Sequence, residues 1–348
     1  MTMDLSTGNF ISDLERWRDF FLNIRSAKGR ADRTLTIYQG VIDDFIEFGR
    51  QHQGQCQMQD INLGYMAGYF NEKLTMARDK KIKFGKTTHS LHYDVLKSFL
   101  SFITEQNHDS FTLGRGMKEL RVKPEIKQKI GYSRDEYQRV LNNLEIAKIK
   151  GRREPTTYRN ALIFKIVLFT GIRAAEMAGL CFKDVEALTH IQKDTEGKEE
   201  RYNIFRFTVK GKGGKTRAVA LEYEAIDEEM SYFTEKLPND APIAFSSLRD
   251  KALSPAEIGV IFSRLAKQSS VNRRGAHILR HTYAQDLVDR GENLHTISLM
   301  LGHSSPAVTS KFYAGKAEKS RLGASIRVGE SRRNAIKEAK DGTKDGTI

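Results

Sequence analysis

Three absences limit what this 348-residue chain can be. Its only cysteines are Cys56 and Cys181, too few for the disulfide framework of a small secreted domain. No apolar run approaches the roughly 20 residues needed to span a bilayer. Residues 1–17 (MTMDLSTGNFISDLERW) contain acidic side chains and no basic stretch followed by an apolar core, unlike a secretory signal. These absences predict a cytoplasmic protein with reduced thiols.

Acidic residues are too few to balance the basic ones. The chain has 57 Lys and Arg against 44 Asp and Glu, a formal net charge of +13. Such a surplus favours a polyanionic partner, either nucleic acid or an anionic membrane, although many basic proteins bind no anion specifically. The absence of a membrane segment favours nucleic acid.

The motifs of several common site classes are also missing. His277 and His281 stand four apart, but no cysteine lies near them and no Glu directly follows His277, which argues against a zinc site. No Gly-x-Ser-x-Gly elbow indicates a serine hydrolase. The stretch Lys210-Gly-Lys-Gly-Gly-Lys-Thr216 superficially resembles a phosphate-binding loop. That loop would need glycine in place of Val209 and a helix after it, where the pattern predicts a strand.

The first 120 residues predict an all-helical domain. Apolar residues recur at spacings of three and four over residues 10–25, 34–48 and 61–76. A fourth helix, capped by Thr87 or Thr88, is expected to run through Ile103. The basic connection before it is either a solvated loop or a set of phosphate contacts made by Lys80, Lys81, Lys83 and Lys86.

Residues 121–132 are basic and aperiodic, and we expect them to link this domain to a second one at 133–327. Ser133 and Glu136 match a helix capping box. The apolar run 162–169 predicts a buried helix that ends at Gly171. Residues 328–348 are charged and poor in apolar side chains, which predicts a flexible tail.

Two stretches, 205–209 and 218–221, alternate with a period of two and predict an antiparallel hairpin with lysines at its tip. A short strand is expected at 242–245, and Ser254 is expected to cap a helix through Leu265. The expected fold is therefore mainly α with a small antiparallel β-sheet, in two domains.

Residues 275–315 predict three short helices that carry polar groups. His277 and Arg280 stand three apart on the first, and Gly302 ends the second just before His303. The third carries Tyr313. Taken alone, each of these side chains has an ordinary structural role.

A second cationic position follows the apolar run. Arg173 and Glu176 are three apart, the spacing of a surface ion pair. An arginine fixed beside a core would also suit a phosphate clamp. Transfer of a phosphodiester needs cations for the phosphate oxygens, a nucleophile, and an acid for the leaving oxygen. Arginine, tyrosine, lysine and histidine can supply these functions.

The order of the motifs resembles that of tyrosine recombinases, the phage-integrase and Xer family. The matching segments are Thr170-Gly-Ile-Arg173-Ala-Ala-Glu176, Gly211-Lys212-Gly213, His277-Ile-Leu-Arg280-His281, Leu301-Gly-His303 and Phe312-Tyr313. The resemblance covers residues 133–325 and, with weaker motif support, the helical domain, which would be the SAM-like core-binding domain of the family.

The resemblance implies a role for each matching residue. Arg173 and Arg280 would bind the scissile phosphate, and Glu176 would support Arg173. Lys212 would protonate the departing 5′ oxygen, with Lys210 and Lys215 as rivals and as further DNA contacts. His277 would act as acid and base, and His303 would hydrogen-bond the phosphate. Tyr313 would attack and form a 3′-phosphotyrosyl link, with no metal or other cofactor.

The resemblance also implies the partners. The first is double-stranded DNA with a specific site, and the second is further copies of this chain, in a homotetramer that spans two sites. The two domains of each subunit would close around the duplex as a clamp. Residues 316–328 of each subunit would dock into a neighbouring subunit. It implies a nucleoid-associated enzyme and leaves open an accessory protein. A start at the core-binding domain favours an Xer-like resolvase or a compact integrase of a mobile element. The alternatives are a type IB-like topoisomerase and a non-catalytic DNA-binding protein with this fold.

Overall fold

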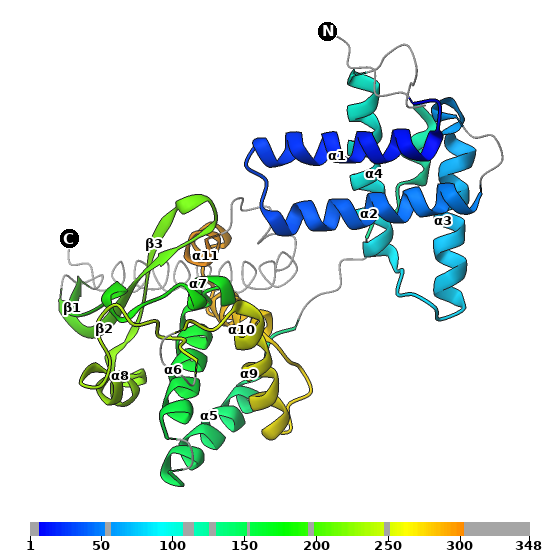
Figure 1. Cartoon of the computed structure of the whole chain (residues 1–348). Helices are drawn as coiled ribbons and strands as arrows, with labels where there is room; N and C mark the ends of the chain where they lie inside the picture. Colours follow the sequence, from blue (N-terminus) through cyan, green and yellow to red (C-terminus); the bar gives the residue numbers. More distant parts are fainter. Residues whose placement is uncertain are drawn as a thin grey trace, which may run out of the picture. The chain divides into compact units, whose positions relative to one another are not determined.

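The computed structural model describes residues 7–52, 57–106, 115–124, 130–151, 154–193, 198–246 and 251–302. The chain divides into two compact units, Met1–Lys127 and Gln128–Ile348, which Figure 1 colours from blue to cyan and from green to orange. None of the described helices combines the length and the apolar character that crossing a membrane requires.

The first unit is helical throughout its described residues. Its α-helices are α1 (Phe10–Ala27), α2 (Asp32–Gln51), α3 (Leu63–Arg78) and α4 (Lys86–Gln106), with 3-10 turns at Met58–Asp60 and Arg115–Leu120. The helices α1 and α2 lie side by side, and both contact α4 (Figure 1). Large aromatic side chains form the core, among them the fully buried Trp17, Phe21, Phe45 and Phe99.

Each of the four expected helices is present. One start was placed wrongly, because α4 begins at Lys86 and so Thr87 and Thr88 lie in its first turn rather than at its cap. The first bond of this helix runs from the His89 N–H to the Gly85 carbonyl, at 2.9 Å.

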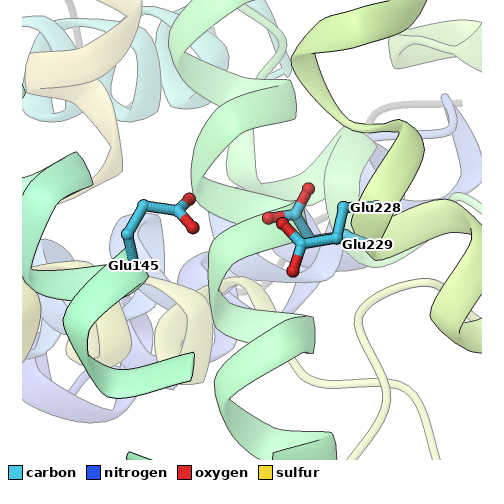
Figure 2. A group of neighbouring side chains, drawn as sticks. All are labelled: Glu145, Glu228 and Glu229. Atoms are coloured by element: carbon cyan, nitrogen blue, oxygen red, sulfur yellow. The ribbon is translucent and has the colours of Figure 1, made fainter. Parts of the chain in front are cut away.

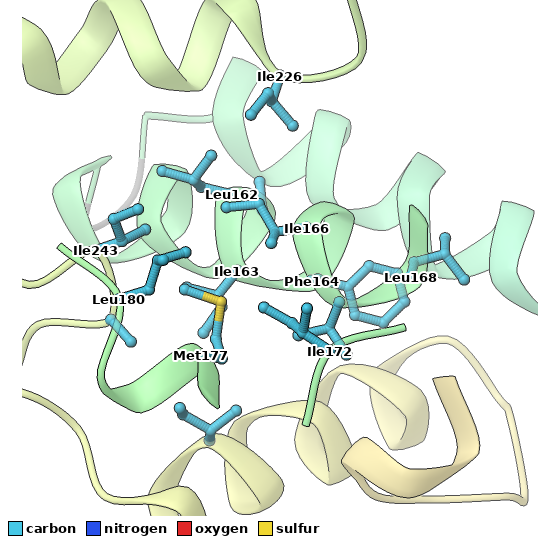
Figure 3. Packing of buried hydrophobic residues seen from close by; sticks show 14 of the residues in the cluster. Leu162, Ile163, Phe164, Ile166, Leu168, Ile172, Met177, Leu180, Ile226 and Ile243 are labelled. Atoms are coloured by element: carbon cyan, nitrogen blue, oxygen red, sulfur yellow. The ribbon is translucent and has the colours of Figure 1, made fainter. Parts of the chain in front are cut away.

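The second unit surrounds one long buried helix. Its α-helices are α5 (Arg134–Ile149), α6 (Glu154–Thr170), α7 (Ala174–Ala178), α8 (Asp227–Thr234), α9 (Pro255–Gln268), α10 (Ala276–Asp289) and α11 (Leu294–Leu301). The expected apolar run lies in α6 and packs on α5, α8 and α10. Figure 3 shows part of this core: Leu162, Ile163, Phe164, Ile166, Leu168, Ile172, Met177, Leu180, Ile226 and Ile243.

Local signals set the ends of these helices. The Ser133 hydroxyl accepts from the Glu136 N–H, and Glu136 accepts in return from the Ser133 N–H at 2.8 Å, so the expected capping box is confirmed. The chain turns after α6 at Gly171, whose φ is +64°. A Cβ there would lie 2.5 Å from the ring of Tyr283, so this turn has room only for glycine.

The sheet has three antiparallel strands in the order β1 (Val185–Lys193), β2 (Glu199–Lys210) and β3 (Thr216–Glu222). The expected hairpin is β2–β3, with Phe207 opposite Val219 and Val209 opposite Arg217. The sequence pattern did not predict β1. The mainly α fold with a small antiparallel sheet is confirmed.

The prediction of a strand at 242–245 was wrong. Among the described residues this stretch makes two isolated bridges, Cys181 with Pro242 and Phe245 with Ala252. Around Pro242 the Phe182 N–H donates to the Ala241 carbonyl at 3.1 Å and the Ile243 N–H donates to the Leu180 carbonyl at 2.9 Å, so this single bridge does not use the proline nitrogen.

The entry into the second unit is held against α10. The Tyr132 N–H donates to the Thr282 hydroxyl at 2.8 Å, and the Tyr132 hydroxyl donates to the Arg273 carbonyl at 3.0 Å. A Cβ on Gly131 would lie 2.6 Å from the Thr282 backbone. Gly131 and Tyr132 are therefore fixed to the helix that carries His277 and Arg280, whereas linker residues 125–129 lie outside the described part of the chain.

Candidate active site

Arg173 lies at the turn between α6 and α7 and is held from two directions. Its Nη1 donates to Glu176 Oε1, and its Nη2 donates to the carbonyl oxygen of Gly302, both at 2.8 Å. Glu176 Oε2 accepts from the Arg173 backbone N–H, also at 2.8 Å. The expected ion pair exists, but it is not a surface pair, because Glu176 is only 6% exposed.

Arg280 lies on the buried side of α10, with 7% of its surface exposed. Its Nη1 donates to the Gly171 carbonyl at 2.8 Å and its Nη2 to the Leu301 carbonyl at 2.7 Å. His277, one turn earlier, is exposed. The turn after α6 and the end of α11 therefore share one guanidinium.

The end of α11 is where the arginines meet. The carbonyls of Met300, Leu301 and Gly302 accept hydrogen bonds from Arg217, Arg280 and Arg173, respectively. The last carbonyls of a helix lack partners within it and carry partial negative charge, so cations gather there. Gly302 ends the helix with a left-handed φ of +64°.

Arg217, on β3, is a member of this cluster that the motifs did not reveal. Its Nη1 and Nη2 donate to Oε1 and Oε2 of Glu176, each at 2.8 Å, and its Nε donates to the Met300 carbonyl at 3.2 Å. The sequence contained one indication of this role. Leu221, Val219 and Arg217 are alternate residues of one strand, so Arg217 lies on the same inner face as the two apolar residues. A charged residue on the inner face of a strand requires a buried partner.

The Glu176 carboxyl is ionised at neutral pH. Burial alone would raise its pKa, but hydrogen bonds from Arg217 and from the Arg173 backbone, with the charge of Arg217, lower the pKa to about 2. One carboxylate therefore faces two guanidinium groups, and the cluster keeps a net positive charge.

The lysine hairpin begins beside this cluster. The Gly211 N–H donates to the Lys215 carbonyl at 2.7 Å, and a Cβ on Gly211 would lie 3.7 Å from Glu176 Oε1. Lys212 starts the 3-10 turn Lys212–Gly214, which contains left-handed Gly213. Lys210 and Lys215, on either side, are exposed.

Other candidates are placed elsewhere or are not described. In the first unit, Lys80, Lys81, Lys83 and Lys86 are all exposed at the connection between α3 and α4. Lys81 lies 3.7 Å from Asp79, a weak surface pair. His303, Tyr313, the segment 316–328 and the tail 328–348 lie outside the described residues.

A group of three carboxylates in the second unit has the spacing of a metal site. Figure 2 shows Glu145 of α5 facing Glu228 and Glu229 of α8. One carboxylate oxygen from each of the three lies within 4.8 Å of the other two. The Lys148 ammonium lies 2.7 Å from Glu145 and 2.8 Å from Glu229, and Lys165 lies 2.8 Å from Glu229.

These lysines give the carboxylates their counter-charges. Burial alone would lower the pKa of Lys148, but hydrogen bonds with Glu145, Glu228 and Glu229 raise it above the ordinary value. We interpret this group, defined as Glu145, Lys148, Lys165, Glu228 and Glu229, as an acid–lysine network that joins α5, α6 and α8.

Comparison with known sequences adds an independent finding. Residues 132–320 match the phage integrase family. The chain is similar to the tyrosine recombinase XerC of Thermodesulfovibrio yellowstonii, with 23% identity over 300 residues that cover 84% of this chain and 88% of the relative.

Solved structures share the fold. The XerH site-specific recombinase in a post-cleavage complex with a palindromic difH substrate has a TM-score of 0.68 and 20% identity, over 91% of this chain and 84% of that chain. A lambda integrase tetramer bound to a Holliday junction has a TM-score of 0.59 and 19% identity, over 84% of this chain and 78% of that chain.

Proposed function

Because the chain belongs to the phage integrase family of tyrosine recombinases, which cleave and rejoin DNA, we propose that it is a site-specific recombinase with a covalent 3′-phosphotyrosyl intermediate. The observation that carries the proposal is the meeting of Arg173 and Arg280 at the end of α11. The Arg280 guanidinium is held by two backbone carbonyls, and that of Arg173 by one carbonyl and the Glu176 carboxylate, so both are preorganised to neutralise one phosphate. His303 directly follows Gly302, whose carbonyl oxygen accepts the hydrogen bond from Arg173.

In the proposed reaction, the phenol oxygen of Tyr313 attacks the scissile phosphorus and loses its proton, which His277 accepts. The bond from phosphorus to the 5′ oxygen breaks, and Lys212 donates a proton to that oxygen. His303 hydrogen-bonds the phosphate. A phosphodiester is exchanged for a phosphotyrosyl ester, so a 5′ hydroxyl from another strand can reverse the step without an external energy source.

We extend the proposal to the partners. Residues 1–120 would form the core-binding domain and residues 133–327 the catalytic domain, and the charge of +13 would make DNA binding salt-dependent. The names of similar proteins, XerH bound to difH and a lambda integrase tetramer on a Holliday junction, support a specific duplex site and a homotetramer. The substrate would be either sister sites of a replicon or the ends of a mobile element.

The test is capture of DNA on Tyr313. The wild-type chain is incubated with a duplex library of random sequence, and DNA that stays attached in detergent is recovered and sequenced. We expect an enriched site whose adduct maps to Tyr313. Tyr313→Phe should bind this duplex with similar affinity and form no adduct, and an adduct on that variant would refute the assignment.

The same material separates the alternatives. A recombinase should exchange strands between two copies of the recovered site. Relaxation of supercoiled DNA by monomers without exchange would indicate a type IB-like topoisomerase. Tight binding of DNA with no adduct on the wild-type chain would indicate a non-catalytic DNA-binding protein.

A further inference from the structure

Arg217 contacts or adjoins three segments that carry proposed active-site residues. Its guanidinium makes a two-point pair with Glu176 of α7, at 2.8 Å for each bond. Its Nε donates to the carbonyl of Met300, three residues before His303. A Cβ on Gly211, the residue before Lys212, would lie 3.9 Å from its Nη1.

The side chain of Arg217 is held in one arrangement. It starts from a residue of β3 that pairs with the buried Val209 of β2, so it points to the inner face of the sheet. Only 16% of the side chain is exposed. The planar guanidinium uses all three of its nitrogens, which a lysine ammonium could not reproduce with the same geometry.

Arg217 also changes the charge that surrounds Arg173. Glu176 Oε1 accepts from the Nη1 atoms of both arginines, and Oε2 accepts from the Arg173 backbone and from Arg217 Nη2. With Arg217 present, two guanidinium charges face one carboxylate. Without it, Glu176 would neutralise Arg173, and the pair would attract a phosphate much less strongly.

We propose that Arg217 is a positioning residue for DNA cleavage, which holds Glu176 and the end of α11 in place and keeps Arg173 from being neutralised. The inference rests on the proposed function, since it concerns the same site. In this role Arg217 acts through Arg173, Glu176 and the backbone before His303, and it does not itself contact the DNA.

The experiment uses the duplex recovered on wild-type Tyr313, remade with a nick next to the cleavage point. Cleavage then releases a short fragment that diffuses away, so the strand cannot be rejoined and the adduct accumulates. The full-length chain in excess gives the rate of adduct formation at saturation, and gel shift gives the Kd. We expect Arg217→Ala to slow adduct formation by about 100-fold or more while Kd changes less than about threefold. A matched loss of affinity would make Arg217 a DNA contact and overturn the proposal.

A double-mutant cycle tests whether Arg217 acts through Glu176. Glu176→Gln alone should also slow adduct formation, and the double variant should be no slower than the slower single variant. Independent contributions would multiply and would refute the proposed coupling. Arg206→Ala is the matched control, because Arg206 lies on the outer face of the same sheet and pairs with Glu186 at 2.7 Å. Its adduct rate should stay within about twofold of the wild type.

Thermal unfolding of each variant shows whether it is folded. If Arg217→Ala is not, Arg217→Lys takes its place and should still be at least tenfold slower at saturation with an unchanged Tm. A wild-type rate for that variant would overturn the proposal. The two levels of failure are distinct: no adduct on wild-type Tyr313 refutes the proposed function, whereas a wild-type adduct rate for the Arg217 variants refutes only the positioning role.

Discussion

Arg173 and Gly302 are 129 residues apart in the chain, and Arg173 Nη2 donates to the Gly302 carbonyl oxygen at 2.8 Å. This bond ties the turn after α6 to the end of α11. Arg280 repeats the connection through Gly171 and Leu301. A change in the backbone at Gly302 should therefore reach both the arginines and His303, although it removes no polar side chain.

Gly302→Ala should slow cleavage strongly although it lowers the stability of the fold only slightly. The φ of +64° disfavours alanine by about 1 kcal/mol, and the added Cβ would lie 2.8 Å from Arg217 Nη1. The guanidinium cannot move without breaking its bonds to Glu176. We expect adduct formation to slow by about tenfold or more at saturating DNA, measured with the nicked duplex.

The matched control is Gly29→Ala, because Gly29 has a φ of +72° and nothing within 4 Å of an added Cβ. This variant should lose about the same stability and no cleavage activity. Equal cleavage rates for the Gly302 and Gly29 variants would show that the contact with Arg217 is unimportant.

Arg173→Ala should slow cleavage strongly and largely preserve site recognition. Removing a preorganised cation that holds the phosphate costs about 10²–10³-fold in rate. Most phosphate contacts of a DNA-binding protein lie away from the scissile bond, so affinity should remain close to that of Tyr313→Phe. Gel shift and adduct assays on the same duplex measure both quantities. Complete loss of binding would count against a catalytic role for Arg173.

The sequence predicted the parts of the fold that rest on periodicity and local caps. The apolar run of α6 and the Ser133 capping box are signals within a few residues, and both are confirmed. The strand β1 was missed because it is an edge strand whose apolar residues do not keep one face. Leu188 pairs with the outward-facing Ile204, while Val185 pairs with the buried Phe207.

The candidate site was predictable only where a motif is contiguous. Arg173 and Glu176 lie within four residues, and so do His277 and Arg280. The role of Arg217 depends on contacts with Glu176 and Met300, which are 41 and 83 residues away. Spacing along the chain does not predict such contacts. Only the alternation of residues on β3, which places Arg217 on the inner face, indicated that Arg217 must have a buried partner.

Glu176 should make stability depend on pH in the acidic range. Its pKa is about 2 in the folded chain against an ordinary 4.5. A depressed pKa stabilises the folded state fully above the unfolded pKa, and this contribution is lost as the pH falls from about 4.5 towards 2. At 1.36 kcal/mol per unit, it is roughly 3 kcal/mol at neutral pH.

Urea unfolding of the wild type and Glu176→Gln at pH 7 and pH 3 tests this dependence. The wild type should be more stable at pH 7, and the difference should shrink at pH 3. A difference that stays constant between these two values would show that the Glu176 carboxyl is not the titrating group. The carboxyl is ionised throughout the neutral range, so it should contribute nothing to the pH dependence of cleavage there.

Lys148→Met should weaken the second unit without slowing cleavage. Lys148 is 7% exposed and the Glu229 carboxylate is fully buried, so removing the ammonium leaves Glu229 with Lys165 as its remaining counter-charge in the network. Breaking a buried ion pair by removing one partner costs about 3–5 kcal/mol, and the remaining Lys165 should place the loss near the lower end. Urea unfolding measures the loss.

Lys193→Met is the matched control for this substitution. Lys193 lies 3.8 Å from Glu199, and both side chains are largely exposed, so its loss should cost less than about 0.5 kcal/mol. Both variants should form adducts at the wild-type rate at a temperature where they are folded, because α5, α6 and α8 carry none of the proposed catalytic residues. Slow cleavage by folded Lys148→Met would instead connect the acid–lysine network to the site, through the turn that leads from α6 to Arg173.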